Sequence, residues 1–460
     1  MGVAVSNWKL ANAVARAGGL GVVSGSLLDT VLVRRLQDGD IGGHMRRAIA
    51  AFPIPGVGDE ILKRYFSPSG RAPGTPYKLL PMYKQTVSAA RQRVTVLANF
   101  VEVWLAKEGH DVPIGMNLLT KLQIPNMPSL YGAMLAGVGV VIMGAGIPRE
   151  IPGVLDAFAE HRPARMRFEV EGLARDEAEF LEFDPATIAT PDLMTKPLKR
   201  PAFLPVVSAA SLAMTLARKS NGRVDGFVIE GPTAGGHNAP PRGELRLTDA
   251  GEPIYGERDV VDLAKMRELG LPFWLAGGTG SPEGLRNALA CGAAGIQVGT
   301  LFAYCAESGL EASLKARVLE NVVAGTATLR TDPRASPTGY PFKVVELPGD
   351  AAQALMRERV CDLGYLRVPV RTTEGRTVYR CSAEPVDTFI AKGGDAAETE
   401  GRRCLCNGLT ANVGLAQWRA ETGEEEIPLV TSGDDLLELG DFIAGHPGYT
   451  AAQAIAYLNG

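Results

Sequence analysis

Hydrophobic residues along this chain recur in short runs, and most of these runs are followed by a stretch with helical periodicity. Apolar runs bounded by small or turn-forming residues are typical of buried strands. The runs predict strands at 1–6, 19–24, 112–118, 138–144, 203–208, 224–230, 272–277 and 294–299. The periodic stretches predict helices at 8–17, 85–109, 126–136, 149–160, 209–219, 258–269 and 281–291. Alternation of strands and helices predicts an α/β fold with a parallel sheet and right-handed crossovers.

Eight strands favour a closed (β/α)8 TIM barrel, with an open doubly wound sheet as the alternative. Residues 1–308 would form the barrel, and residues 309–460 a C-terminal extension of helical and mixed structure. The pattern at 1–6 reads as the end of a strand, so we expect a short first strand or a start codon placed late.

Two segments inside the predicted barrel do not follow the alternating pattern. Residues 26–84 contain proline, glycine and charge in irregular order, which predicts a large insertion after the second strand, above the barrel mouth. Residues 161–202 contain two stretches that alternate with a period of two, which predicts a hairpin insertion before the fifth strand.

Three consecutive predicted strands end in glycine or another small residue. The run 224–230 leads into a small-residue turn that ends at His237, the next ends in Gly277-Gly278, and the third ends in Gly299-Thr300. Glycine lets backbone N–H groups approach an anion closely, and barrel enzymes often bind phosphate after strands seven and eight. The simpler alternative is that these glycines only form tight turns.

His237 is the histidine with the most suggestive context, since it follows small residues beyond a strand end. An imidazole exchanges protons near neutral pH, so His237 is the candidate catalytic acid or base, although it could merely cap a loop. We expect the other histidines, His44, His110, His161 and His446, to be structural or at the surface.

Composition limits the classes of function. Hydrophobic residues make up 46% and charged residues 21% of 460 residues, which is typical of a globular protein. The net charge of −4 argues against a nucleic-acid partner. No run of 18 apolar residues and no signal peptide are present, so we expect a cytoplasmic protein without a membrane span.

Four of the six cysteines lie in the last hundred residues: Cys361, Cys381, Cys404 and Cys406. Four thiolates suit zinc, but the spacing is not that of paired C-x-x-C motifs. Buried thiols that serve the fold of the extension are the other interpretation, and we assign no metal ligand from the sequence.

Several of these motifs resemble the nitronate monooxygenase family, formerly called 2-nitropropane dioxygenases. Residues 1–6 resemble the family's first-strand motif, and Ala234-Gly235-Gly236-His237 its catalytic-histidine motif. Residues 276–278 and 297–300 resemble its FMN phosphate motifs, and Ile114-Gly115-Met116-Asn117 its third strand. Flavin-dependent enoyl-ACP reductases share nearly all of these motifs. The chain departs from the common pattern at Glu230, where many members have glutamine.

The resemblance implies that FMN is the cofactor. It implies His237 as the catalytic residue and twelve residues as FMN contacts: Met1, Gly2, Asn117, Glu230, Gly235, Gly236, Gly277, Gly278, Gln297, Val298, Gly299 and Thr300. No G-x-G-x-x-G fingerprint with a downstream acid follows any strand, so a bound mononucleotide is preferred to NAD.

The implied function is oxidation of an alkyl nitronate, or of a similar small carbon acid, with dioxygen. The partners would be this small-molecule substrate and dioxygen, and the sequence sets no oligomeric state. The alternative is an enoyl-thioester reductase of the same fold that uses NAD(P)H. An alternative of another class is a flavin-binding scaffold or subunit whose C-terminal extension docks a partner.

Overall fold

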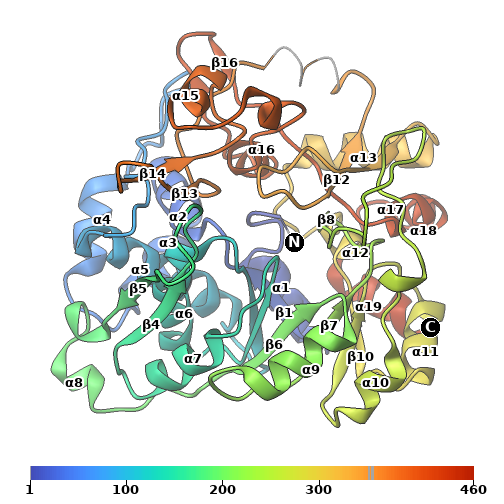
Figure 1. The fold of residues 1–460 in the computed structure, drawn as a ribbon, viewed down its shortest axis with the longest axis horizontal. Helices are drawn as coiled ribbons and strands as arrows, with labels where there is room; N and C mark the ends of the chain where they lie inside the picture. The colour runs from blue at the N-terminus through green and yellow to red at the C-terminus, as the bar shows by residue number, and fades with distance from the viewer. Residues whose placement is uncertain (1, 351–352, 354–356) are drawn as a thin grey trace.

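The computed structural model describes residues 2–350, 353 and 357–460, and its centre is a curled sheet of seven parallel strands (Figure 1). The strands follow one another across the sheet in chain order, interrupted only by strands that belong to other sheets. They are β1 (Gly21–Ser24), β2 (Ile114–Leu119), β3 (Val140–Gly144), β6 (Ala202–Val207), β7 (Phe227–Glu230), β9 (Phe273–Ala276) and β10 (Gly295–Gln297). The α/β class and the parallel order predicted from the sequence are confirmed.

The predicted first strand at 1–6 is wrong, because the described residues 2–6 form turns. Gly2 and Ala4 have φ values of 60° and 50°, in the left-handed region, which a strand cannot contain. The segment still lies beside β1, where the Ser24 N–H donates to the Ser6 carbonyl at 2.9 Å. The described sheet therefore has seven strands in barrel order instead of a closed ring of eight.

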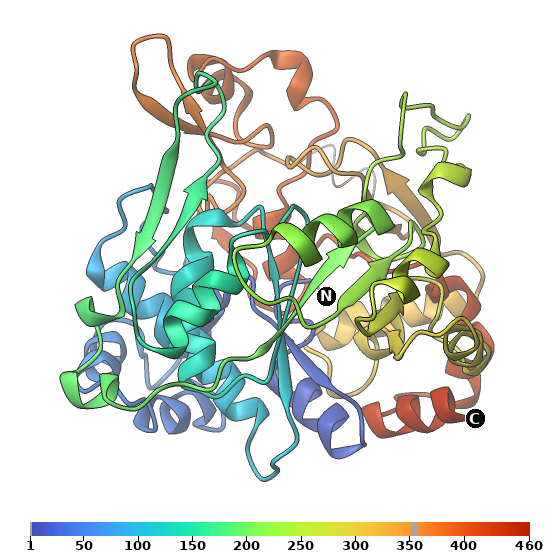
Figure 2. The same ribbon diagram turned by 60° about the horizontal axis from the view of Figure 1, so that its bottom comes forward.

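One helix precedes β1, the others connect successive strands as predicted, and together they cover the outer face of the sheet (Figure 2). Local capping fixes two of their starts. Asn7 accepts from the Leu10 N–H at 3.0 Å, and Ser88 accepts from the Arg91 N–H at 3.3 Å. These helices are α1 (Trp8–Arg16), α5 (Ala89–Ala106), α6 (Gln123–Leu135), α7 (Ile151–Ala159), α9 (Ala210–Lys219), α10 (Leu263–Glu268) and α11 (Pro282–Ala290).

The insertion at 26–84 differs from the expected irregular excursion above the mouth. It contains three helices, α2 (Leu28–Gln37), α3 (His44–Ala50) and α4 (Val57–Tyr65), and all three contact α5. Their apolar side chains join the main core that α5 and the sheet share. Apart from Gly58 in α4, the glycine and proline residues that made the segment look irregular lie outside the three helices.

The second insertion contains the predicted hairpin, formed by antiparallel β4 (Ala164–Phe168) and β5 (Glu179–Phe183). Met166 pairs with Leu181, and alternate residues of both strands are buried, which explains the period of two in the sequence. A short helix α8 (Pro191–Met194) and the 3-10 turn Pro185–Thr187 follow the hairpin.

The extension 309–460, called the tail below, lies over the carboxyl ends of the strands and then returns to the barrel (Figure 1). Its strand β12 (Phe342–Glu346) pairs with the two-residue strand β8 (Gly236–His237). Its last helix, α19 (Ala451–Asn459), contacts α1 and α11 (Figure 2).

The tail's helices are α13 (Ala312–Val323), α15 (Val386–Ala391), α16 (Leu405–Ala411), α17 (Asp435–Glu438), α18 (Gly440–Gly445) and α19 (Ala451–Asn459). Its strands are β11 (Thr328–Asp332), β12 (Phe342–Glu346), β13 (Val368–Arg371), β14 (Thr377–Arg380), β15 (Trp418–Arg419) and β16 (Glu424–Glu425), with a 3-10 turn at Ala396–Thr399. The remaining barrel elements are β8 (Gly236–His237), the 3-10 turn Glu257–Asp259 and α12 (Thr300–Ala303). None of the helices in the described part of the chain is long and apolar enough to cross a membrane.

Gly132 of α6 allows the close approach of α5, and replacing it tests the packing on which β2 and β3 rest. A Cβ atom at Gly132 would lie 2.1 Å from the Val96 carbonyl oxygen, a backbone atom that cannot rotate away. We expect Gly132→Ala to lower the free energy of unfolding by about 1–3 kcal/mol, the usual cost of overpacking. Thermal and urea unfolding monitored by circular dichroism measure the change.

The matched control is Gly440→Ala at the start of α18, where a Cβ atom would meet nothing within 4 Å. This change should be neutral or slightly stabilising, since alanine favours a helix by up to about 1 kcal/mol over glycine. Equal stability of the two variants would show that the α5–α6 contact is not as close as described.

Candidate active site

The strand register brings the predicted site residues to one level at the carboxyl edge of the sheet. Glu230 at the end of β7 pairs with Ala276 of β9, and Ala276 pairs with Gln297 of β10. On β2, Asn117 pairs with Ser24 of β1. Parallel α/β proteins bind their ligands at this edge, because loops from several strands meet there.

A cavity of about 420 Å³ lies at this edge, within the usual size range of ligand pockets, about 300–1,000 Å³. Its wall combines glycine backbone with a few polar side chains and apolar residues of α1 and α19. Eight of the predicted residues line it: Gly2, Glu230, Gly235, Gly277, Gln297, Val298, Gly299 and Thr300.

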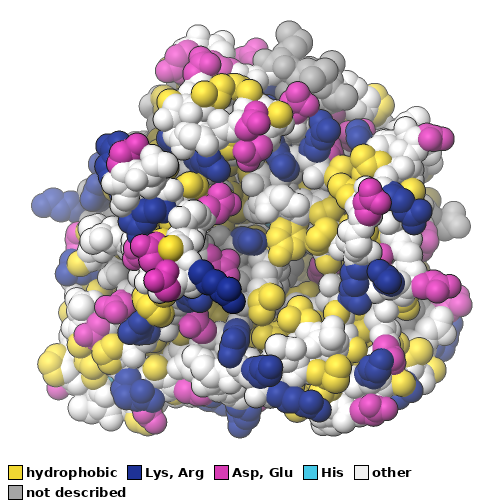
Figure 3. Space-filling model, viewed as in Figure 1, with side chains coloured by type: hydrophobic (Ala, Val, Ile, Leu, Met, Phe, Trp, Pro, Cys, Tyr) yellow, Lys and Arg dark blue, Asp and Glu magenta, His cyan; other side chains and the backbone are white. Residues whose placement is uncertain are grey.

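A second cavity of about 140 Å³ adjoins the first and contains His237, Asn117 and Gly236. The two cavities share five lining residues, which are Gly2, Glu230, Gly235, Gln297 and Thr431. Hydrophobic side chains gather near the centre of the face seen in Figure 3.

Of the other two predicted residues, Gly278 lines neither cavity, and Met1 lies outside the described residues.

His237 is held by contacts from the tail. Its Nε2 lies 2.7 Å from the Ser336 hydroxyl, which in turn lies 2.7 Å from the Thr338 hydroxyl. The imidazole also meets the Phe342 ring edge to face, with 4.9 Å between centroids. Burial lowers the pKa of His237 to about 4 from its usual value of 6.5. At neutral pH the imidazole is therefore uncharged.

The pKa of Glu230 shifts in the opposite direction to that of His237. Burial raises the pKa of its carboxyl group to about 7 from the usual 4.5. Near neutral pH this group can therefore either donate or accept a hydrogen bond, and it lines both cavities.

Three glycines at the strand ends have different physical roles. Gly277 has a φ of 87°, which favours glycine, and Gly235 lies so close to the tail that a Cβ atom would be 2.6 Å from the Ser432 carbonyl carbon. Neither a positive φ nor a close backbone contact requires glycine at position 299. Its φ is −111°, and a Cβ atom would meet nothing within 4 Å, so this residue of the larger cavity's wall has open space beside it.

The segment 431–435 of the tail completes the wall, and the sequence analysis missed it. The Thr431 hydroxyl accepts from the Gly236 N–H at 2.8 Å, and the Gly433 N–H donates to the Thr300 hydroxyl at 2.9 Å. The Asp435 carboxyl accepts from the Gly280 N–H at 3.2 Å, and burial raises its pKa. The short polar run Thr431-Ser432-Gly433 is the only signal in the sequence, and it resembles an ordinary turn.

A parallel α/β sheet with a glycine-lined cavity at its carboxyl edge defines a class of proteins that bind small ligands there. Residues 165–335 match the family model described as nitronate monooxygenase. This segment contains His237 and the glycine turns, and the match confirms the resemblance to that family drawn from the motifs.

Curated proteins match over parts of the chain. A nitronate monooxygenase of Pseudomonas aeruginosa is 29% identical over 199 residues, which are 42% of this chain and 49% of that protein. A probable nitronate monooxygenase of Bacillus subtilis is 32% identical over 136 residues, 30% of this chain and 37% of that protein. The third is a hydroxy-methyl-oxo-octahydroindene-carboxyl-CoA dehydrogenase of Mycobacterium tuberculosis, 29% identical over 143 residues, 31% and 34% of the two chains. The matches span at most about half the length of these relatives.

Two solved structures align along the chain at low similarity. FabK from Thermotoga maritima is 16% identical with a TM-score of 0.44, covering 98% of this chain and 88% of that one. A nitroalkane oxidase from Streptomyces ansochromogenes is also 16% identical with a TM-score of 0.44, covering 100% and 92%.

The low pKa of His237 predicts a pH dependence of stability. Between pH 6.5 and about 4 the unfolded chain binds a proton at this imidazole that the folded chain does not bind. The free energy of unfolding should therefore fall as the pH falls through this window, and it should fall less in His237→Gln. Urea unfolding at several pH values measures the difference. An imidazole NMR signal of His237 that titrates near pH 6.5 would contradict the expectation.

Proposed function

We propose that this chain is an FMN-dependent oxidoreductase of the nitronate monooxygenase type, acting on an alkyl nitronate or a similar small carbon acid. The observation that supports the proposal most directly is the junction of two cavities. One is lined by the glycine turns of β9 and β10, and the other contains the uncharged imidazole of His237.

The residues at the strand ends fit FMN. Gly299 leaves open the space that any side chain would fill, so a phosphate can approach the backbone there. Gln297 offers an amide at the junction of the cavities, where the flavin ring would meet the substrate. Glu230 lies beside it with a raised pKa, which suits hydrogen bonding to ribityl hydroxyls or ring atoms.

In the proposed reaction, bound FMN supplies the electron-transfer chemistry that no side chain of the protein can provide. His237 takes the α-proton of the carbon acid, because its imidazole is uncharged at neutral pH and buried next to the cavity. Ser336 positions that imidazole through the 2.7 Å contact with Nε2. Phe342 and the apolar wall exclude water from the proton-transfer path.

The second candidate is an enoyl-thioester reductase that uses NAD(P)H, and it is favoured by the relative named as a carboxyl-CoA dehydrogenase. Oxygen consumption with alkyl nitronates and no reduced nicotinamide supports the first function. NAD(P)H oxidation that starts only when an enoyl thioester is added supports the second and would overturn the first.

Gly299→Asp and Gly299→Asn form a matched pair that tests the phosphate position. Both side chains have open space at this position of the cavity wall and have nearly the same size, but only aspartate is charged. We expect aspartate to weaken FMN binding at least tenfold more than asparagine does, because it repels the phosphate. Riboflavin, which lacks the phosphate, should show no such difference. Fluorescence titration of the apoprotein measures both ligands, and an equal loss of FMN in both variants would exclude a phosphate at Gly299.

His237→Gln tests the proton acceptor. We expect turnover of a neutral nitroalkane to fall about 10²–10⁴-fold, the usual contribution of a general base, while FMN stays bound. Turnover of the preformed nitronate should fall much less, since its α-proton is already gone. Ser336→Ala should lower nitroalkane turnover moderately and shift its pH profile. Wild-type turnover of the nitroalkane by His237→Gln would leave His237 as a structural residue.

A further inference from the structure

Four cysteines of the tail surround one small cavity, although they come from three separate segments. Cys361 lies in the loop before β13, Cys381 directly follows β14, and Cys404 and Cys406 lie at the start of α16. Proximity along the chain explains only the Cys404–Cys406 pair, so the fold itself brings the four thiols together. All six cysteines of the chain are unpaired thiols in the structure.

The cavity between these thiols has a volume of about 10 Å³, the room of about one water molecule. Its other walls are largely apolar and include Leu363, Leu366 and Leu405. Burial, and to a lesser extent the neighbouring Cys404, raise the pKa of the Cys361 thiol to about 12. Such thiols stay protonated unless a metal displaces their protons.

Arg367 lines the four-cysteine cavity, and Arg359 and Arg402 belong to the same part of the tail. Arg367 donates to the Tyr83 carbonyl at 2.7 Å, Arg359 to the Thr399 carbonyl at 2.6 Å, and Arg402 to the Arg334 carbonyl at 2.9 Å. Within the described ranges none of these arginines forms an ion pair with a carboxylate. A partly buried cation without an anionic partner is costly, and an anionic group among the thiols would compensate the charge of Arg367, which lines the cavity.

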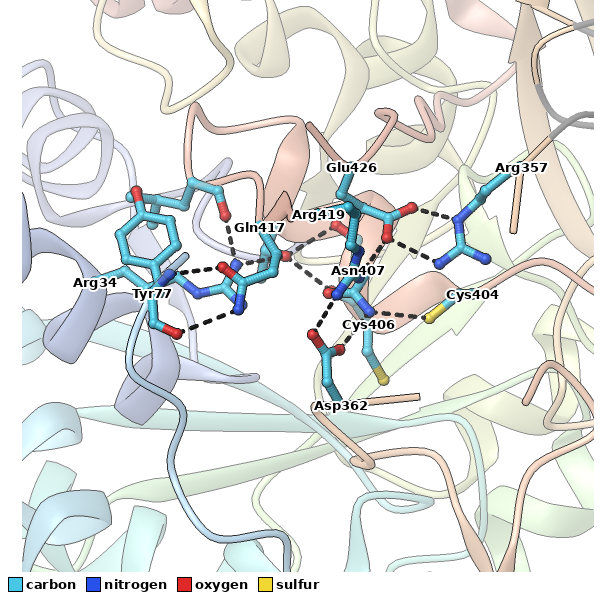
Figure 4. A network of polar contacts seen from close by, with 12 residues as sticks. Arg34, Tyr77, Arg357, Asp362, Cys404, Cys406, Asn407, Gln417, Arg419 and Glu426 are labelled. Carbon is cyan, nitrogen blue, oxygen red and sulfur yellow. Dashed lines mark hydrogen bonds and ion pairs between the residues drawn. The ribbon is translucent and has the colours of Figure 1, made fainter. Parts of the chain in front are cut away.

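One thiol also accepts a hydrogen bond from a buried polar network (Figure 4). The Asn407 amide lies 3.6 Å from Cys404 Sγ and donates to the Asp362 carboxylate at 2.7 Å. Asp362 is held in turn by Arg419 at 2.6 Å. Amide donors that are fixed in this way are typical of the surroundings of metal-bound thiolates, whose potential they tune.

We propose that Cys361, Cys381, Cys404 and Cys406 are the ligands of an iron–sulphur cluster. Four cysteine thiolates bind either zinc or such a cluster. A zinc ion needs all four sulphur atoms about 2.3 Å from one point. In the described part of the chain no group of three or more His, Cys, Asp or Glu side chains is arranged to hold a metal ion.

A cluster differs from a zinc ion because it carries iron and sulphide between its ligands. Thiols that stand around a void, as these do, suit it better than a single ion. Each thiol would lose its proton to solvent as its sulphur bonds to iron.

The cluster would lie next to the candidate active site. Leu366, Leu405 and Cys406 line both the four-cysteine cavity and the cavity that contains His237. A redox centre would therefore share a wall with the substrate chamber. The cluster proposal itself does not depend on which ligand occupies that chamber.

The test is elemental analysis of the full chain, purified without oxygen from iron-supplemented cells. We expect iron and acid-labile sulphide in equal amounts, about two to four of each per chain. Reduction with dithionite should give an electron paramagnetic resonance signal that flavin alone does not give. One zinc per chain without iron would overturn the cluster, and absence of both metals after anaerobic reconstitution with iron and sulphide would overturn any metal site.

Variants assign the ligands. Cys361→Ser and Cys381→Ser should each lose at least four fifths of the iron, whereas Cys291→Ser, an exposed thiol at the end of α11, should keep it. Circular dichroism shows whether each variant is folded. If a ligand variant does not fold, the metal content of the wild-type chain still decides the proposal. Full iron retention in a folded Cys361→Ser and Cys381→Ser double variant would overturn it.

Discussion

The backbone of residues 431–435 lies directly against the turns that follow β7 and β9. The position of the tail over the carboxyl ends of the strands depends on this contact. Gly235 is the critical point, since a Cβ atom there would collide with the backbone of Ser432 and Gly433. The Gly236 N–H and the Thr300 hydroxyl complete the contact through hydrogen bonds to the same tail segment. Because the tail can approach this closely, it forms part of the cavity wall.

The same approach explains how a histidine on a barrel loop becomes buried. β8 contains only two residues, too few to be stable alone, and it is held by pairing with β12 of the tail. That pairing sets Phe342 against the imidazole, and the turn just before β12 supplies Ser336. The low pKa of His237 is therefore a consequence of tail docking as much as of the barrel itself.

Strand positions and their order could be predicted from the sequence, because apolar runs that end in glycine are a local signal. The helices of 26–84 were missed for a local reason as well, since glycine and proline in the turns mask short periodic stretches. At the N-terminus the error is the reverse, since a strand was predicted where none forms. The composition of residues 2–6 is strand-like, but Gly2 and Ala4 have left-handed φ values.

The contributions of the tail to the site could not be predicted, because they depend on contacts between residues far apart in sequence. Ser336 lies about a hundred positions from His237, and Thr431 almost two hundred from Gly236. The four-cysteine cavity has the same origin: its thiols meet only after β13, β14 and α16 are in place. Short strands and short helices bury little apolar surface. The part of the tail formed by β13, β14 and α16 therefore needs other sources of stability, such as buried ion pairs or a bound metal. The ion pairs of Arg419 with Asp362 and Glu426 are one such source, and they lie directly beside the thiols that the proposed cluster would join.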